Sequence, residues 1–143
     1  MKQRQLLVIE DDPDIATIVC DVANEVGFKT HTAQTSKEIA QQYENIQPDV
    51  IILDLLMPDQ DGFETLHFLS ERCCTAHIVI LSGQDRYRGM AEGLGRALGI
   101  SVVDNISKPF RIADLRDKLR VIMSQLPDEE SSDSLPNSSE DAA

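Results

Sequence analysis

Apolar residues along the chain fall into five short runs. The runs cover residues 6–9 (LLVI), 28–33 (FKTHTA, a weak alternation), 50–54 (VIILD), 77–82 (HIVILS) and 100–106 (ISVVDNI). Short apolar runs bounded by polar or turn-forming residues are typical of strands. The pattern therefore predicts five strands.

Between these runs the apolar residues recur at helical spacing, and several residues mark where helices begin and end. Asp12 suits an N-cap before Pro13 in the first turn, and Gly27 suits a helix stop. Thr35 and Glu38 have the spacing of a capping box. Helices are expected over residues 13–27, 35–46, 62–72 and 112–126, and a glycine-containing helix is expected to end near residue 98.

Strands and helices therefore alternate along the chain as five βα units. Such chains form a parallel sheet with helices on both faces, joined by right-handed connections. We expect an α/β fold with a doubly wound five-stranded sheet. Because ligands of such sheets bind beyond the carboxyl ends of the strands, the residues that follow each strand are the informative ones.

Charged and hydroxyl side chains stand where the predicted strands end. They are the acids at 10–12 after the first strand, Asp54 in the third, Ser82 in the fourth and Lys108 after the fifth. A strand order of 2-1-3-4-5 would place the first and third strands side by side and gather the acids in one crevice. A divalent cation would relieve the repulsion between them, and oxygen ligands suit Mg²⁺.

Ser82 and Lys108 are donors suited to anionic oxygens, and a phosphoryl group on Asp54 would supply three. A carboxylate can act as a nucleophile toward such a group. We therefore interpret Asp54 as a phosphoacceptor. Taken alone, Ser82 would equally suit a turn and Lys108 a solvated surface, while Asp12 is better explained as a helix cap.

The residues IEDD, ILDLLMPDQDG, ILSG and SKPF, in this order and spacing, resemble those of the receiver domains of two-component response regulators. The resemblance covers about residues 5–126. It implies a flavodoxin-like fold with strand order 2-1-3-4-5 and a phosphoryl group accepted from a sensor histidine kinase or phosphotransfer protein. It implies a bacterial signalling switch with self-catalysed phosphorylation and dephosphorylation rather than a turnover enzyme.

By this resemblance, Asp54 is the phosphoacceptor. Mg²⁺ is bound directly by Asp11, by Asp54 and by the backbone carbonyl of Leu56, and Glu10 acts on it through water. Ser82 matches the hydroxyl that closes on the phosphoryl group.

Lys108 matches the lysine that pairs with the phosphoryl group, and Pro109 matches a proline whose peptide bond is cis. Met57, Pro58 and Gly62 match the residues that shape the loop after the phosphoacceptor. The sequence departs from the family at Asn105, where a Tyr or Phe usually reports on phosphorylation by rotating. The aromatic part of that switch is therefore in doubt, and the sequence suggests no substitute.

Composition and charge restrict which classes of partner the domain can bind and in which compartment it is expected. The chain has 25 acidic and 13 basic residues, and a net charge of −12 argues against a nucleic-acid surface on this domain. No apolar run approaches the ~20 residues needed to span a membrane. The three cysteines form no C-x-x-C pair, which suits a reducing cytoplasm.

The last 17 residues differ in composition from the rest. Residues 127–143 hold six acidic residues, no basic ones and few apolar ones. Such a segment cannot bury enough apolar surface to order itself. We expect residues 1–126 to form the receiver domain and residues 127–143 to form a disordered acidic tail or linker.

The output of the switch is left open by the sequence. A downstream partner protein, a missing C-terminal effector domain and a homodimer all remain candidates. The segment AEGLGRALGISVVDNISKPFRIADL resembles receivers joined to cyclic-di-GMP phosphodiesterase domains.

Two other functions fit the sequence less well than the receiver interpretation. A haloacid-dehalogenase-like phosphohydrolase also forms an aspartyl phosphate, but places an acid two residues after its nucleophile, where this chain has Leu56. A flavodoxin-type nucleotide or flavin site is disfavoured, because the first loop, EDDPD, lacks glycine and would repel phosphate.

Overall fold

The computed structural model describes residues 3–57 and 61–127, and over these residues five strands alternate with five helices. The elements are β1 (Gln5–Ile9), α1 (Pro13–Val26), β2 (Lys29–Ala33), α2 (Ser36–Ile46), β3 (Val50–Asp54), α3 (Gly62–Glu71), β4 (His77–Ser82), α4 (Asp85–Leu98), β5 (Ser101–Ser107) and α5 (Ile112–Gln125). The predicted alternation is confirmed, with ends that differ by about a residue. Pro58 and residues 128–143 of the expected tail lie outside the described residues.

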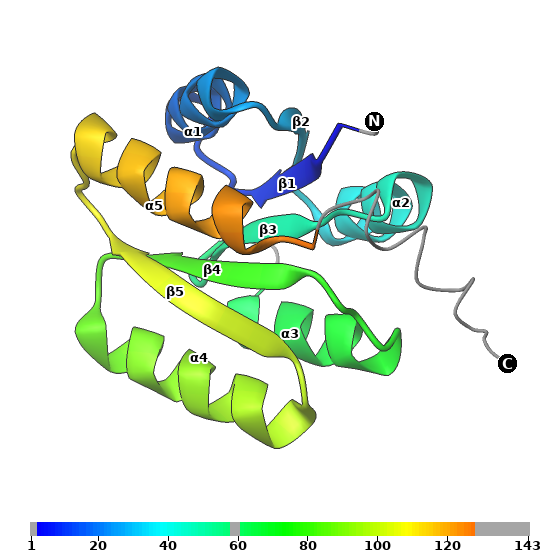
Figure 1. The fold of residues 1–143 in the computed structure, drawn as a ribbon. Coiled ribbons are helices and arrows are strands. Elements are labelled where there is room, and N and C mark those ends of the chain that lie inside the picture. Colours follow the sequence, from blue (N-terminus) through cyan, green and yellow to red (C-terminus); the bar gives the residue numbers. More distant parts are fainter. Residues whose placement is uncertain (1–2, 58–60, 128–143) are drawn as a thin grey trace, which may run out of the picture.

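The strands form a single parallel sheet in the order β2-β1-β3-β4-β5, as predicted. Helices α1 and α5 cover one face, and α2, α3 and α4 cover the other (Figure 1). The α/β doubly wound, flavodoxin-like fold is therefore confirmed. Its consequence is that the carboxyl ends of β1, β3, β4 and β5 meet along one edge.

The central strand β3 is buried on both faces, which explains its uninterrupted apolar sequence. Val50 and Ile52 pack toward α1 and α5, whereas Ile51 and Leu53 pack into the core under α2, α3 and α4. Alternate side chains point to opposite faces. Asp54 thus ends a strand that is held rigidly from both sides.

The helices begin and end where the sequence places caps. The Asp12 side chain accepts hydrogen bonds from the backbone N–H groups of Asp14 and Ile15, and Gly27 ends α1 with φ of 120°. Thr35 Oγ1 accepts from the backbone N–H of Glu38 at 3.2 Å. Helix lengths run from 10 to 14 residues, and along the described part of the chain no helix is both long enough and apolar enough to cross a bilayer.

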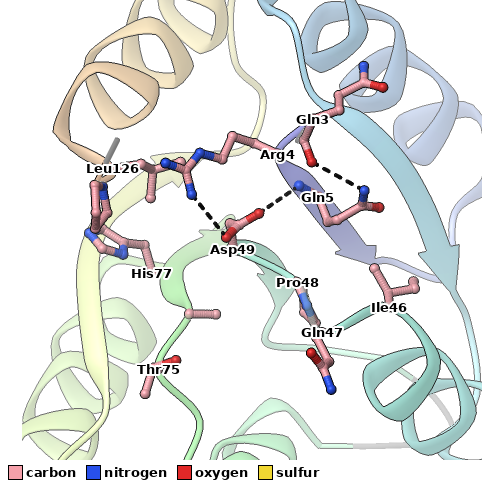
Figure 2. Close-up of a pocket in the computed structure, with 12 residues that line it drawn as sticks. Gln3, Arg4, Gln5, Ile46, Gln47, Pro48, Asp49, Thr75, His77 and Leu126 are labelled. Atoms are coloured by element: carbon pink, nitrogen blue, oxygen red, sulfur yellow. Dashed lines mark hydrogen bonds and ion pairs between the residues drawn. The ribbon is translucent and has the colours of Figure 1, made fainter. Parts of the chain in front are cut away.

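A cavity of about 460 Å³ lies at the amino ends of the strands, opposite the end that carries Asp54 (Figure 2). Asp49 stands in it and accepts a hydrogen bond from the backbone N–H of Gln5 at 2.8 Å. Arg4 Nη1 lies 3.5 Å from the same carboxylate, and the backbone N–H of His77 donates to the Asp49 carbonyl oxygen. Asp49 therefore joins β1, β3 and β4 at this end of the sheet.

The edge strand β5 carries an irregularity that decides which way its side chains point. Val102 pairs with Ile78 but Asp104 pairs with the next residue, Val79, so Val103 is an extra residue in the manner of a β-bulge. Beyond it, Asp104 faces Lys118 of α5 and Asn105 faces α4. The register then places Ser107 beside Ser82 at the strand tips.

Two glycines of α4 give a matched test of this packing. A Cβ on Gly95 would lie 2.5 Å from Cγ2 of Val102, whereas a Cβ on Gly89 would meet nothing within 4 Å. Because valine is stiff at χ1, we expect Gly95→Ala to lower the free energy of unfolding by about 1–3 kcal/mol. Gly89→Ala should instead raise it by about 1 kcal/mol through helix propensity.

Urea unfolding of the two variants and the wild type measures both effects. Equal stabilisation by the two substitutions would contradict the close approach of α4 to β5.

Candidate functional site

Strand register brings the predicted site residues to one edge of the sheet. Ile9 pairs with Leu53, so the next residues, Glu10 and Asp54, lie at adjacent strand tips. Ser82 pairs with Ser107, and the backbone N–H of Lys108 donates to the Ser82 carbonyl oxygen at 3.0 Å. Residues far apart in sequence thus converge because parallel strands end together.

Three carboxylates form a cluster at this edge. Oxygens of Glu10, Asp11 and Asp54 all lie within 4.8 Å of one another. Glu10 is fully buried and Asp54 is 3 % exposed. Burial raises the pKa of Glu10, and the nearby Asp54 carboxylate adds to the rise. Burial and the neighbouring Glu10 carboxyl likewise raise the pKa of Asp11.

Lys108 supplies positive charge to the cluster. Its Nζ lies 2.9 Å from Glu10 Oε1 and 3.4 Å from Asp54 Oδ2. Burial alone would lower the pKa of Lys108, but its close contacts with the Glu10 and Asp54 carboxylates outweigh burial and raise that pKa. The ammonium therefore stays charged, and among the described residues it faces three acids.

The hydrogen bonds of the Glu10 carboxylate do not satisfy both of its oxygens. Its Oε2 accepts a hydrogen bond from the backbone N–H of Asp12 at 3.1 Å. Its Oε1 is buried and accepts no well-aligned hydrogen bond from the described residues, so the ion pair with Lys108 is what offsets its charge. Hard oxygen donors with excess negative charge fit a divalent cation such as Mg²⁺.

Ser82 stands at the tip of β4, 2 % exposed. Its Oγ accepts a hydrogen bond from the backbone N–H of Gln84 at 3.1 Å and lies 3.4 Å from the Gln84 carbonyl oxygen. The hydroxyl is thus engaged with the residue that precedes α4. Gln84 cannot be singled out from the sequence, because its contact with Ser82 is made by the backbone.

Leu56 contacts the site through its backbone. Its N–H donates to Asp54 Oδ1 at 3.2 Å, and Leu56 pairs with Asp61 in an antiparallel bridge. Its side chain is 51 % exposed. A Cβ on Gly62 would lie 2.6 Å from the Leu55 Cα, so the backbone at the start of α3 lies close against the residue that follows Asp54.

Two further predicted positions lie on or just beyond β5. The Lys108–Pro109 peptide bond is cis. Asn105 Nδ2 donates to Glu92 Oε2 of α4 at 2.8 Å. Sequence reasoning did not find Glu92, because nothing in a single sequence links a helical glutamate to an asparagine 13 residues later.

Comparison with known proteins identifies the family. Residues 6–120 match the model of the response regulator receiver domain. The chain belongs to this family. Receiver domains act as signalling switches rather than as classical enzymes, and the match gives no support to the haloacid-dehalogenase alternative.

Relatives and solved structures agree with this assignment. The phosphate regulon transcriptional regulatory protein PhoB of Escherichia coli is 30% identical over 125 residues, which cover 86% of this chain and 53% of PhoB. The transcriptional regulatory protein KdpE of Staphylococcus aureus is 33% identical over 123 residues, or 84% of this chain and 50% of KdpE.

A solved response regulator from Chloroflexus aurantiacus superposes with a TM-score of 0.72 at 27% identity, covering 87% of this chain and all of that one. The chemotaxis protein CheY4 of Vibrio cholerae, at 22% identity and a TM-score of 0.72, covers 85% of this chain and 99% of its own, and shows the same fold. This chain spans about half the length of PhoB and of KdpE.

Removal of Lys108 tests how much its ion pairs with the buried carboxylates contribute to the free energy of unfolding. Lys108→Ala leaves Glu10 buried beside two other acids, so in metal-free buffer we expect the free energy of unfolding to fall by about 2–4 kcal/mol. Lys118→Ala is the matched control, because it removes an ion pair with Asp104 that is one-third exposed. It should cost at most about 1 kcal/mol.

Urea unfolding with EDTA present measures both variants. A loss for Lys108→Ala no larger than that for Lys118→Ala would contradict the buried pairing.

Proposed function

We propose that the chain is a phosphorylation-dependent signalling receiver whose phosphoacceptor is Asp54. The observation that carries the proposal is the placement of this carboxylate, 3 % exposed at a strand tip, with the Lys108 ammonium 3.4 Å away and two further acids beside it. A carboxylate with a cation beside it at the carboxyl end of a strand is suited to nucleophilic attack on a phosphoryl group.

In the proposed reaction an Asp54 carboxylate oxygen attacks the phosphorus of a phosphohistidine. A new O–P bond forms as the P–N bond breaks, and the imidazole leaves with the electron pair and takes up a proton from solvent. With acetyl phosphate as donor, acetate leaves instead. Either route gives an acyl phosphate on Asp54. Water later attacks its phosphorus, the O–P bond to Asp54 breaks, and inorganic phosphate leaves as the carboxylate is restored.

Lys108 stabilises the charge that accumulates on the phosphoryl oxygens, because its ammonium already lies at the Asp54 carboxylate. Glu10 and Asp54 hold that ammonium in place from two sides. The Ser82 hydroxyl stands at the next strand tip and is proposed to donate to a phosphoryl oxygen by leaving Gln84.

Glu10, Asp11 and Asp54 are the side chains proposed to hold Mg²⁺, with the Leu56 carbonyl oxygen as the backbone ligand and Glu10 acting through water. The bound ion would neutralise the carboxylates and bring the phosphoryl donor to them. The raised pKa values of Glu10 and Asp11 support this assignment, as does the buried Glu10 oxygen that has an ion pair but no aligned hydrogen bond.

A sensor histidine kinase or phosphotransfer protein is the proposed donor, in the cytoplasm. Residues 1–126 are proposed as the receiver domain and residues 127–143 as a tail or linker. Because the named relatives are transcriptional regulatory proteins about twice as long as the matched segment, an effector domain joined to the receiver is a natural output. A separate partner protein is the alternative.

Phosphorylation of the purified chain is the first test. After incubation with acetyl phosphate and Mg²⁺, intact mass should show the gain of one phosphoryl group in the wild type and none in Asp54→Ala. Asp21→Asn changes an exposed carboxylate of α1 and should behave as the wild type. An equal gain in Asp54→Ala would exclude Asp54 as the acceptor.

Cation binding is tested by stability. Mg²⁺ at ten times its dissociation constant should raise the free energy of unfolding by about 1.4 kcal/mol, since the ion binds the folded state. The gain should vanish in Asp11→Asn and Asp54→Asn and persist in Asp21→Asn. Urea unfolding with and without Mg²⁺ measures it, and a gain retained in both site variants would place the cation elsewhere.

A further inference from the structure

Two polar contacts fasten α4 to the edge strand β5. Asn105 Nδ2 donates to Glu92 Oε2 at 2.8 Å, and Arg88 Nη1 donates to Ser107 Oγ at 3.0 Å. Asn105 and Glu92 are both partly buried, so their hydrogen bond is shielded from water more than a surface pair is. We call the Asn105–Glu92 hydrogen bond the latch.

The helix that the latch holds is intrinsically weak. Helix α4 contains Gly89, Gly93 and Gly95 within its 14 residues, and its N-cap residue, Gln84, makes no side-chain capping bond. Gly95 is required because Val102 leaves no room for a Cβ, but a Cβ at Gly89 would meet nothing and one at Gly93 would be in ordinary contact. Two glycines therefore lower the helix propensity without a packing reason.

The first turn of the same helix is tied to the strand tips. Ser82 Oγ accepts a hydrogen bond from the backbone N–H of Gln84, immediately before α4. The Tyr87 ring packs edge-on against Phe63, with ring centroids 6.3 Å apart, and Phe63 lies in the first turn of α3. A movement of the Ser82 hydroxyl or of the start of α3 therefore acts directly on the start of α4.

We propose that the latch holds α4 against β5 in the unmodified protein, and that opening the latch is how this chain reports on its site. Asn105 and Glu92 are then positioning residues for α4. Gly89 and Gly93 weaken the helix and so lower the free energy needed to open the latch. The proposal rests on the proposed function for its trigger: when the Ser82 hydroxyl turns to a phosphoryl oxygen on Asp54, Gln84 loses its partner and α4 loosens. A ligand can shift an equilibrium only through such a difference between two states.

Amide hydrogen exchange of α4 in the unmodified protein tests the latch. Loss of a partly buried hydrogen bond should speed exchange of α4 amides about three- to tenfold in Asn105→Ala and in Glu92→Ala. Because both substitutions remove the same bond, the double variant should exceed the larger single effect by less than about twofold. Gly89→Ala should slow exchange about fivefold.

Two controls separate the latch from general destabilisation. Lys118→Ala removes a contact of β5 with α5 on the opposite face, and should leave α4 exchange unchanged. Amides of β3 in the same samples report global unfolding, and their rates should change less than those of α4. Exchange in α4 that matches the wild type in both single variants, or effects that multiply in the double variant, would overturn the latch.

The trigger is tested in the same proteins after acetyl phosphate and Mg²⁺, with occupancy read by intact mass. Phosphorylated wild type should exchange α4 amides several-fold faster, while phosphorylated Asn105→Ala should gain less than about twofold over its own unmodified form. Full occupancy with unchanged α4 exchange in the wild type would overturn the trigger. Failure to gain any phosphoryl group would instead overturn the proposed function and, with it, the trigger, whereas exchange in the unmodified variants would still decide the latch.

Discussion

The structure depends on an imbalance of charge at the carboxyl edge of the sheet, where the Lys108 ammonium faces Glu10, Asp11 and Asp54 among the described residues. The ammonium lies between the tips of β1 and β3 and holds two buried carboxylates that would otherwise repel one another. It does not neutralise all three, and one Glu10 oxygen is left with an ion pair but no aligned hydrogen bond. An edge built in this way is suited to take up further positive charge and to position an anionic group next to Asp54.

Packing, capping and hydrogen bonds in the surrounding elements hold the residues of this edge in place. Apolar residues on both faces of β3 fix Asp54, and the Asp12 cap starts α1 directly after the acids. The close approach of Gly62 to Leu55 holds the start of α3 against the end of β3. At the other end of the sheet Asp49 ties three strands together, so that the strands enter the site in register. Together these features bring Glu10, Asp54 and Lys108, which are distant in sequence, within contact distance.

Much of this could be predicted from the sequence, and the reasons are physical. Strand runs, helix caps and the βα alternation are local signals, and parallel order then forces the residues after β1, β3, β4 and β5 into one crevice. What the sequence could not supply were contacts chosen by side-chain packing. The bulge at Val103, which turns Asn105 toward α4, and the hydrogen bond from Asn105 to Glu92 depend on tertiary register, and neither leaves a local pattern. Asn105, which stands where the family usually has an aromatic residue, thus makes a hydrogen bond to α4 in the structure.

The most direct test of the central claim is the chemical nature and position of the phosphoryl group after treatment with acetyl phosphate and Mg²⁺. An acyl phosphate reacts with hydroxylamine, whereas a phosphate ester of serine does not. We predict that hydroxylamine releases the phosphoryl group and leaves a hydroxamate on Asp54, located by peptide mass spectrometry. A phosphoryl group that resists hydroxylamine, or a hydroxamate on another acid such as Glu10 or Asp11, would contradict the account.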